Sequence, residues 1–121
     1  MTHFWRNALV LMMLLLGSGS VQARALHVSD SSPKAEAIYD GRNAQYVIRF
    51  DGLVDHEASR MDITKDGRIV QTLVPIRDSE PDVLAASAPA LTPGRYQLHW
   101  RVKSAPDGEF SDGLIPFTIA R

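Results

Sequence analysis

A strict alternation of apolar and polar residues near the C-terminus constrains the fold of this chain more than any other feature. Four apolar residues occupy every second position of one segment: Tyr96, Leu98, Trp100 and Val102. Side chains two residues apart share a face of a strand, whereas a helix repeats every 3.6 residues. The segment therefore predicts a half-buried strand, entered through the turn residues Pro93-Gly94. A Gly-containing connection at 107–109 and a closing strand at 116–119 are expected to follow it.

The same alternation recurs upstream. Residues 44–51 alternate with a period of two, and Lys65-Asp-Gly-Arg68 is typical of a hairpin turn. Residues 82–88 lie between two prolines, so they fit a short strand or an irregular loop. Further short strands are expected at 26–28, 61–63 and 69–74, with a turn cluster at 29–33.

Short strands separated by Pro, Gly and Asp turns at intervals of about ten residues predict an all-β fold. We expect an immunoglobulin-like antiparallel β-sandwich of about seven strands. The alternation also predicts which side chains form its core, namely Tyr46, Ile48, Phe50, Ile63, Leu73, Leu98, Trp100, Val102, Phe117 and Ile119.

Residues 1–23 have the pattern of a secretory signal peptide: Arg6, an apolar run from Ala8 to Leu16, and a small polar stretch up to Ala23. Nine apolar residues are too few for a membrane span, which needs about 20. Cleavage after Ala23 or after Ala25 fits the rule of small residues around the cleaved bond. A single domain over residues 24–121 would remain, with no membrane insertion after cleavage.

Composition narrows the possible functions. Removing residues 1–23 changes the formal net charge from −1 to −2, and no basic run is present, so nucleic acid is not an expected partner. The absence of cysteine excludes a disulfide framework and a thiolate metal site. We expect an exported monomer whose stability comes from a packed sheet core.

The C-terminal half resembles the CopC family of periplasmic copper-resistance proteins. Its run "L-x-P-G-x-Y-x-V-x-W-R-V-x-S-x-D-x-H" is matched by residues 91–109, except that Glu109 stands at the position of the histidine and Pro106 is one residue extra. An opening "H-x-x-L-V-S-S-x-P" is matched loosely by 26–33. The middle patterns "L-x-F-S-E-P-V" and "V-x-D-x-x-G-x-x-V" are matched by 47–54 and 61–70. The resemblance thus spans nearly the whole mature chain.

The resemblance implies a periplasmic β-sandwich that binds copper. In many members, Cu(II) is held by a first-position histidine and by the Asp and His of the "D-x-H" loop, a donor set that suits Cu(II). Neither cleavage site places a histidine first here, because His27 becomes the second or the fourth residue. The candidate metal ligands are therefore His27, Asp107 and Glu109. Cleavage after Ala25 would let the Leu26 amine, the His27 peptide nitrogen and its imidazole chelate Cu(II). The alternative is an exposed His27 and a solvated acidic turn.

Other candidate ligands are weaker. Some family members bind Cu(I) through a methionine-rich loop, but here only Met61 remains in the mature chain, so Cu(II) is favoured over Cu(I). His99 should face away from Leu98 and Trp100, and Trp100 is best explained by packing. His56 follows a strand end between two carboxylates, where a polar loop or a weak divalent-metal site fits.

No catalytic motif is present in the sequence, and an enzyme is not expected. The first hypothesis is a periplasmic protein for copper carriage, homeostasis or resistance with a divergent, weakened Cu(II) site. The resemblance also implies an inner-membrane copper transport partner. The alternative is a non-catalytic periplasmic interaction module that has lost metal binding. Carboxylates at the site would also suit zinc or manganese.

Overall fold

The computed structural model describes residues 25–39 and 45–120, which form eight strands and no helix. The predicted signal peptide at 1–23 and Ala44 lie outside the described residues. None of the described segments is a helix of the length and apolarity needed to cross a membrane. The strands are β1 (Val28–Ser32), β2 (Ala37–Tyr39), β3 (Gln45–Phe50), β4 (Arg60–Lys65), β5 (Arg68–Leu73), β6 (Val83–Ser87), β7 (Gly94–Lys103) and β8 (Phe110–Ile119).

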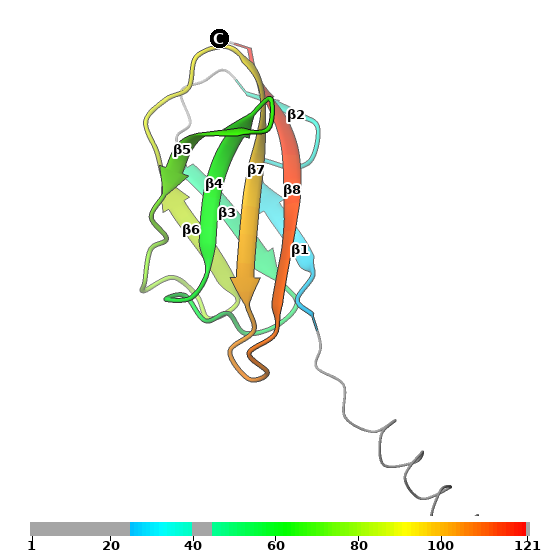
Figure 1. Cartoon of the computed structure of the whole chain (residues 1–121), viewed down its shortest axis with the longest axis vertical. Coiled ribbons are helices and arrows are strands. Elements are labelled where there is room, and N and C mark those ends of the chain that lie inside the picture. The colour runs from blue at the N-terminus through cyan, green and yellow to red at the C-terminus, as the bar shows by residue number, and fades with distance from the viewer. Residues whose placement is uncertain (1–24, 40–44, 121) are drawn as a thin grey trace, which may run out of the picture.

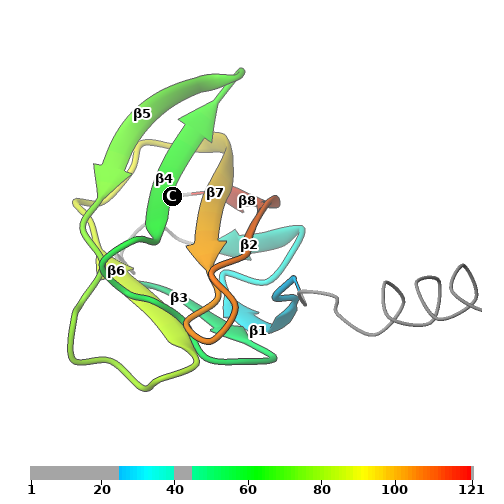
Figure 2. The same cartoon turned by 60° about the horizontal axis from the view of Figure 1, so that its bottom comes forward.

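Two sheets face each other as a sandwich (Figures 1 and 2). The smaller sheet has the order β1-β3-β6, and the larger has the order β2-β8-β7-β4-β5. The long β7–β8 hairpin pairs antiparallel from Gly94 opposite Ile119 to Lys103 opposite Phe110. The all-β sandwich is confirmed. It has eight strands, and the additional strand β2 runs parallel to β8.

The predicted core is confirmed at all ten positions, whose exposed fractions are 7% or less. Phe50 and Trp100 meet edge to face across the two sheets, with their ring centroids 5.1 Å apart. Gly113 lies opposite Trp100 on β8 and makes room for its indole, because a Cβ there would come within 2.6 Å of Trp100 Cζ2. The alternation of β3, β7 and β8 thus supplies both inner faces.

The first strand differs from the sequence prediction. Residues 29–32, expected to be a turn cluster, belong to β1 and pair with β3, whereas Leu26 precedes the strand and is buried. Serine and aspartate have low strand propensity, but an edge strand needs only one paired side, and β3 supplies the pairing. The hairpin turn at 65–68 is confirmed. Asp66 and Gly67 both have positive φ, as a two-residue turn with the twist of a hairpin requires.

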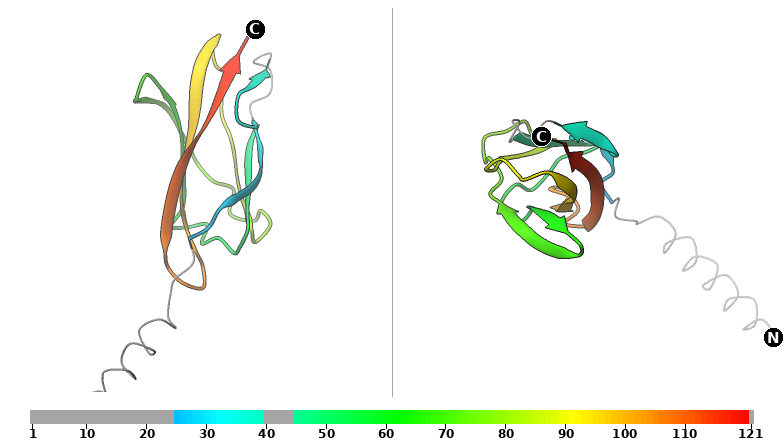
Figure 3. Two further views of the ribbon diagram at one scale, coloured as in Figure 1. Left: turned by 90° about the vertical axis from the view of Figure 1, so that its right-hand side faces the viewer. Right: turned by 90° about the horizontal axis from the view of Figure 1, so that it is seen from above.

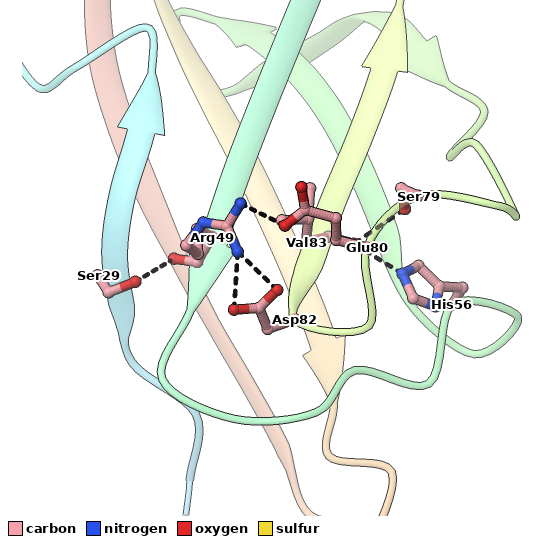
Figure 4. Close-up of polar contacts among 7 residues, drawn as sticks. All are labelled: Ser29, Arg49, His56, Ser79, Glu80, Asp82 and Val83. Carbon is pink, nitrogen blue, oxygen red and sulfur yellow. Dashed lines mark hydrogen bonds and ion pairs between the residues drawn. The ribbon is translucent and has the colours of Figure 1, made fainter.

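An ion-pair cluster fastens the segment before β6 to β3 (Figure 4). Arg49 Nη1 donates to both carboxylate oxygens of Asp82, at 2.7 and 2.9 Å, and Nη2 donates to Glu80 at 2.6 Å. Hydrogen bonds to Glu80 and then to Asp82 raise the pKa of Arg49 above its usual value. Within segment 82–88, which the sequence left open between strand and loop, residues 83–87 form strand β6 and pair antiparallel with β3.

Candidate metal site

The segment before β1 is anchored between the two sheets. Leu26 is only 7% exposed, and its carbonyl accepts a hydrogen bond from Ser111 Oγ of β8 at 3.0 Å. The next carbonyl, that of His27, accepts from the backbone N–H of Asp51, just after β3. Gly52 makes the insertion possible, because a Cβ there would lie 2.7 Å from Leu26 Cδ2. The position of His27 is thus fixed by its neighbours on both sheets.

Asp51 is the nearest partner of His27. Its Oδ1 accepts from the His27 backbone N–H at 2.9 Å, and its Oδ2 lies 3.3 Å from His27 Nδ1. The His27 backbone N–H, more than its side chain, holds the pKa of Asp51 below its ordinary value against the opposing effect of desolvation. Sequence reasoning missed Asp51 as a site residue. The only signal was its place directly after the alternating strand, where a loop carboxylate is common.

The loop after β7 is a compact turn built on Ser104. The Ser104 backbone N–H donates to Glu109 O at 2.9 Å, and its carbonyl accepts from the Gly108 N–H at 2.8 Å. Gly108 has φ +70°, a conformation that glycine adopts without strain. The Ala105 N–H donates to Leu53 O, which ties the loop to the segment after β3. Asp107 is therefore presented from a fixed, solvent-exposed turn.

The N-terminal segment and this loop border one pocket of about 130 Å³. Both lie at the same end of the sandwich (Figures 1 and 3). Asp107 and Pro106 line it from the loop, Ala25 and Leu26 from the N-terminal segment, and Asp51 from the end of β3. Glu109 is exposed and is not part of this lining. The geometry thus brings Asp107, Asp51 and the backbone beside His27 to one place.

The candidate ligand side chains around the pocket do not point to one common position. Across residues 25–39 and 45–120, no three His, Asp or Glu side chains are placed so that they could hold one ion. The His27 side chain is 78% exposed and turned to Asp51. Any ion bound here needs a further donor, such as a terminal amine, or a movement of these side chains.

The two other described histidines have local roles. His56 Nε2 donates to Val83 O at 2.7 Å and so ties its loop to β6, beside Ser79, whose hydroxyl donates to the same carbonyl (Figure 4). His99 faces outward from β7, as predicted, between Asp62 and Asp112. Those carboxylates lie 3.7 Å from Nδ1 and 3.9 Å from Nε2, on opposite ring nitrogens, so they do not point to one ion. Met61 is fully buried and Trp100 is a core residue.

Comparison with known proteins identifies the family. The CopC domain model matches residues 28–120. Among solved structures, the chain is similar to CopC from Methylosinus trichosporium OB3b, with 28% sequence identity and a TM-score of 0.71 over 78% of this chain and 93% of that one.

The fold is shared more widely. PcoC, a methionine rich copper resistance protein from Escherichia coli, matches with 17% identity and a TM-score of 0.64 over 79% of this chain and 99% of that one. The selenomethionine form of PcoC matches with 18% identity and a TM-score of 0.62 over 77% and 98% of the two chains. No curated protein matches the chain. Because the family model covers all eight strands of both sheets, this chain belongs to the CopC domain family.

Proposed function

We propose that this protein is an exported, non-enzymatic copper-binding protein of the periplasm, in which residues 1–23 direct export and residues 24–121 bind and release Cu(II). Copper is the cargo of such a protein. The metal site would be divergent, since Glu109 replaces the loop histidine of the family pattern. Membership of the CopC domain family, whose resemblance implied copper binding, supports copper as the ion. We also propose that the protein is a monomer and that it exchanges copper with an inner-membrane transport protein.

The observation that carries the proposal is the convergence of two His27 nitrogens on one carboxylate. The backbone nitrogen and Nδ1 of His27 lie 2.9 and 3.3 Å from the two oxygens of Asp51. A Cu(II) chelate at a second-position histidine uses these same two nitrogens together with the terminal amine, and the peptide nitrogen releases its proton to solvent as the ion binds. Nitrogen donors in a tetragonal arrangement suit Cu(II). They are therefore already turned to a common side before the ion binds.

Cleavage after Ala25 fits this chelate better than cleavage after Ala23. The Leu26 amine would then be the first donor, on a residue that Gly52 and Ser111 hold at the rim of the pocket. Asp51 would give up its two contacts with His27 and contact the ion instead. Asp107 would supply an oxygen from across the pocket. Glu109 stays a predicted ligand, although it is exposed and lies outside the pocket lining. Cleavage after Ala23 leaves two more residues ahead of Leu26 and hence a longer chelate.

The test is a Cu(II) titration of protein exported and cleaved by its own signal, with the N-terminus read by mass spectrometry. Electron paramagnetic resonance of the bound ion should report a stoichiometric tetragonal site with nitrogen ligands. His27→Ala should abolish that signal. His99→Ala is the matched control, because it removes an imidazole from the outer face of β7 and should leave the signal unchanged.

A second function is favoured by one observation: among the described residues, no three ligand side chains converge on an ion. A sandwich that has lost metal binding would serve as a periplasmic interaction module. In that case Cu(II) binding would be weak, non-stoichiometric and equal in the wild type and in His27→Ala. The same titration, repeated with Zn(II) and Mn(II), tests whether the carboxylates select another ion.

A further inference from the structure

One end of the larger sheet carries three cations, two of which lie over an exposed aromatic ring. Phe110, the first residue of β8, is 42% exposed. The Arg101 guanidinium lies 4.4 Å from the centre of its ring, and Lys103 Nζ lies 5.7 Å from it. Arg60 of β4 is directly opposite Arg101 of β7 in the antiparallel register. We refer to Arg60, Arg101, Lys103 and Phe110 as the basic patch.

The arrangement of charges in the basic patch is unfavourable within the isolated chain. Like charges directly opposite each other on neighbouring strands destabilise a sheet. Arg101 also lies opposite Asp112 of β8, yet its guanidinium sits over Phe110, while Asp112 approaches His99 at 3.9 Å. Within the described part of the chain, none of the three cations forms an ion pair. These charges are thus left to interact with something outside the chain.

Neighbouring hydrogen bonds hold the backbone of the basic patch in place. Ser59 is 4% exposed, and its Oγ accepts from the Lys103 N–H at 3.0 Å while donating to Asp55 O at 2.7 Å. The Asp55 carboxylate is itself occupied by the N–H groups of Glu57 and Ala58. This serine joins the start of β4 to the end of β7, so Arg60 and Lys103 keep a fixed spacing.

We propose that the basic patch docks an acidic segment of a partner protein, one that presents two or more carboxylates beside an apolar side chain. Carboxylates would pair with the guanidinium groups of Arg60 and Arg101, which favour this planar acceptor. The apolar side chain would cover Phe110. Charge complementarity selects this occupant, because residues 24–121 have a formal net charge of −2 and the basic patch departs from that sign.

The location of the basic patch links docking to the candidate metal site. Lys103 Cε lies 3.7 Å from the position that a Cβ of Gly108 would take, in the loop that carries Asp107. A docked partner would therefore sit next to the pocket. This part of the inference rests on the proposed copper function, since the partner would deliver or receive the ion there. The docking itself does not depend on copper.

The experiment uses metal-free, full mature protein at low salt. Its probe is a synthetic peptide of alternating glutamate and leucine, and the control peptide has glutamine in place of glutamate. Binding is measured by chemical-shift mapping of backbone amides. We expect concentration-dependent shifts at Arg60, Arg101, Lys103 and Phe110 with the acidic peptide only, and weaker binding as salt is added.

Two double variants separate the basic patch from general charge. R60Q/R101Q should weaken binding of the acidic peptide about tenfold, which corresponds to the loss of two exposed charge contacts. R68Q/R77Q removes the same charge from other exposed positions and should bind as the wild type does. Equal binding by R60Q/R101Q and the wild type, equal loss in both double variants, or shifts centred elsewhere would overturn the proposal.

A membrane is the other anionic surface to test, with vesicles containing phosphatidylglycerol. Vesicle binding that needs Arg60 and Arg101, without peptide binding, would overturn the proposal of a protein partner. His27→Ala distinguishes this inference from the proposed function. That variant should lose Cu(II) and still bind the acidic peptide, so failure of copper binding and failure of docking are separate results.

Discussion

At the scale of single residues, Asp51 is where pH acts on the candidate site. Its pKa lies below the ordinary value of 3.8, chiefly because the His27 backbone N–H donates to it. A lowered pKa means that the ionised carboxylate stabilises the folded state above pH 3.8, and that this contribution is lost as the pH falls through the lowered value. We expect Asp51→Asn to reduce the melting temperature at pH 7. Thermal melts at pH 7 and pH 2.5 should show a smaller difference between the two proteins in acid.

The same substitution tests the metal site. Removing the charge beside the His27 nitrogens should lower Cu(II) affinity by about 10- to 100-fold, the usual effect of losing a partner that orients a ligand. Asp66→Asn is the control, because it also removes one carboxylate but from the exposed turn between β4 and β5, outside the pocket lining. Equal affinity in Asp51→Asn and the wild type would contradict a role for Asp51.

Gly113 illustrates a second effect at this scale, that of shape. Its missing side chain leaves space for Trp100, and a Cβ would come within 2.6 Å of the indole. Gly113→Ala should destabilise the fold by about 1 to 3 kcal/mol, the usual cost of overpacking a core. Urea unfolding followed by tryptophan fluorescence measures it. Leu114→Ala, at the next and 55% exposed position of β8, should change the unfolding free energy by less than about 0.5 kcal/mol.

At the scale of elements, strands with two faces of different polarity could be predicted, whereas the edge strands β1 and β2 could not. Buried and more exposed residues alternate in β3 and β7 because one face of each strand packs on the core, so the sequence shows the same period of two. β1 has the sequence Val-Ser-Asp-Ser-Ser with no buried residue, and β2 has three residues. Both form because a neighbouring strand offers unpaired backbone groups, which is a property of tertiary structure.

The segment before β1 has a fixed position although it is not a strand, and Leu26 packs directly against Gly52. Gly52→Ala would place a Cβ 2.7 Å from Leu26 Cδ2 and push Leu26 out. We expect a folded sandwich in which His27 is no longer held at Asp51, with Cu(II) affinity reduced about tenfold or more. Isothermal titration with Cu(II) and amide exchange at His27 measure these effects.

A double variant identifies the clash as the cause. Leu26→Ala in the Gly52→Ala background removes the atom that the new Cβ would strike, so the two changes should be non-additive and the double variant should hold His27 better than Gly52→Ala alone. Additive losses would place the effect of Gly52→Ala elsewhere than on the anchoring of Leu26.

At the scale of the whole molecule, the sequence predicted which segments meet but not which side chains do. The family resemblance implied that the N-terminus and the loop at Asp107 hold one ion together, and the structure places Leu26 and Asp107 at one pocket. The partnership of His27 with Asp51 depends on the register of β1 on β3, where a shift occurs between Val28 and Asp30. A bulge of this kind leaves no mark in the pattern of apolar residues. The ligand role of Glu109 stays a prediction.

The anchoring of the candidate site to both sheets links copper binding to the stability of the whole sandwich. Leu26 is hydrogen-bonded to Ser111 of the larger sheet. His27 is hydrogen-bonded to Asp51, which follows the central strand of the smaller sheet. An ion held by the folded site alone stabilises it by mass action, by about 2.7 kcal/mol at a free concentration one hundred times the dissociation constant. For a domain of this size that corresponds to a rise of roughly 11 to 22 °C in melting temperature. Differential scanning calorimetry of the processed protein with and without Cu(II) measures the rise. The His99→Ala variant should retain the rise in melting temperature, and the His27→Ala variant should lose it. Equal rises in the wild type and in both variants would mean that copper binds elsewhere and that the contact between His27 and Asp51 has only a structural role.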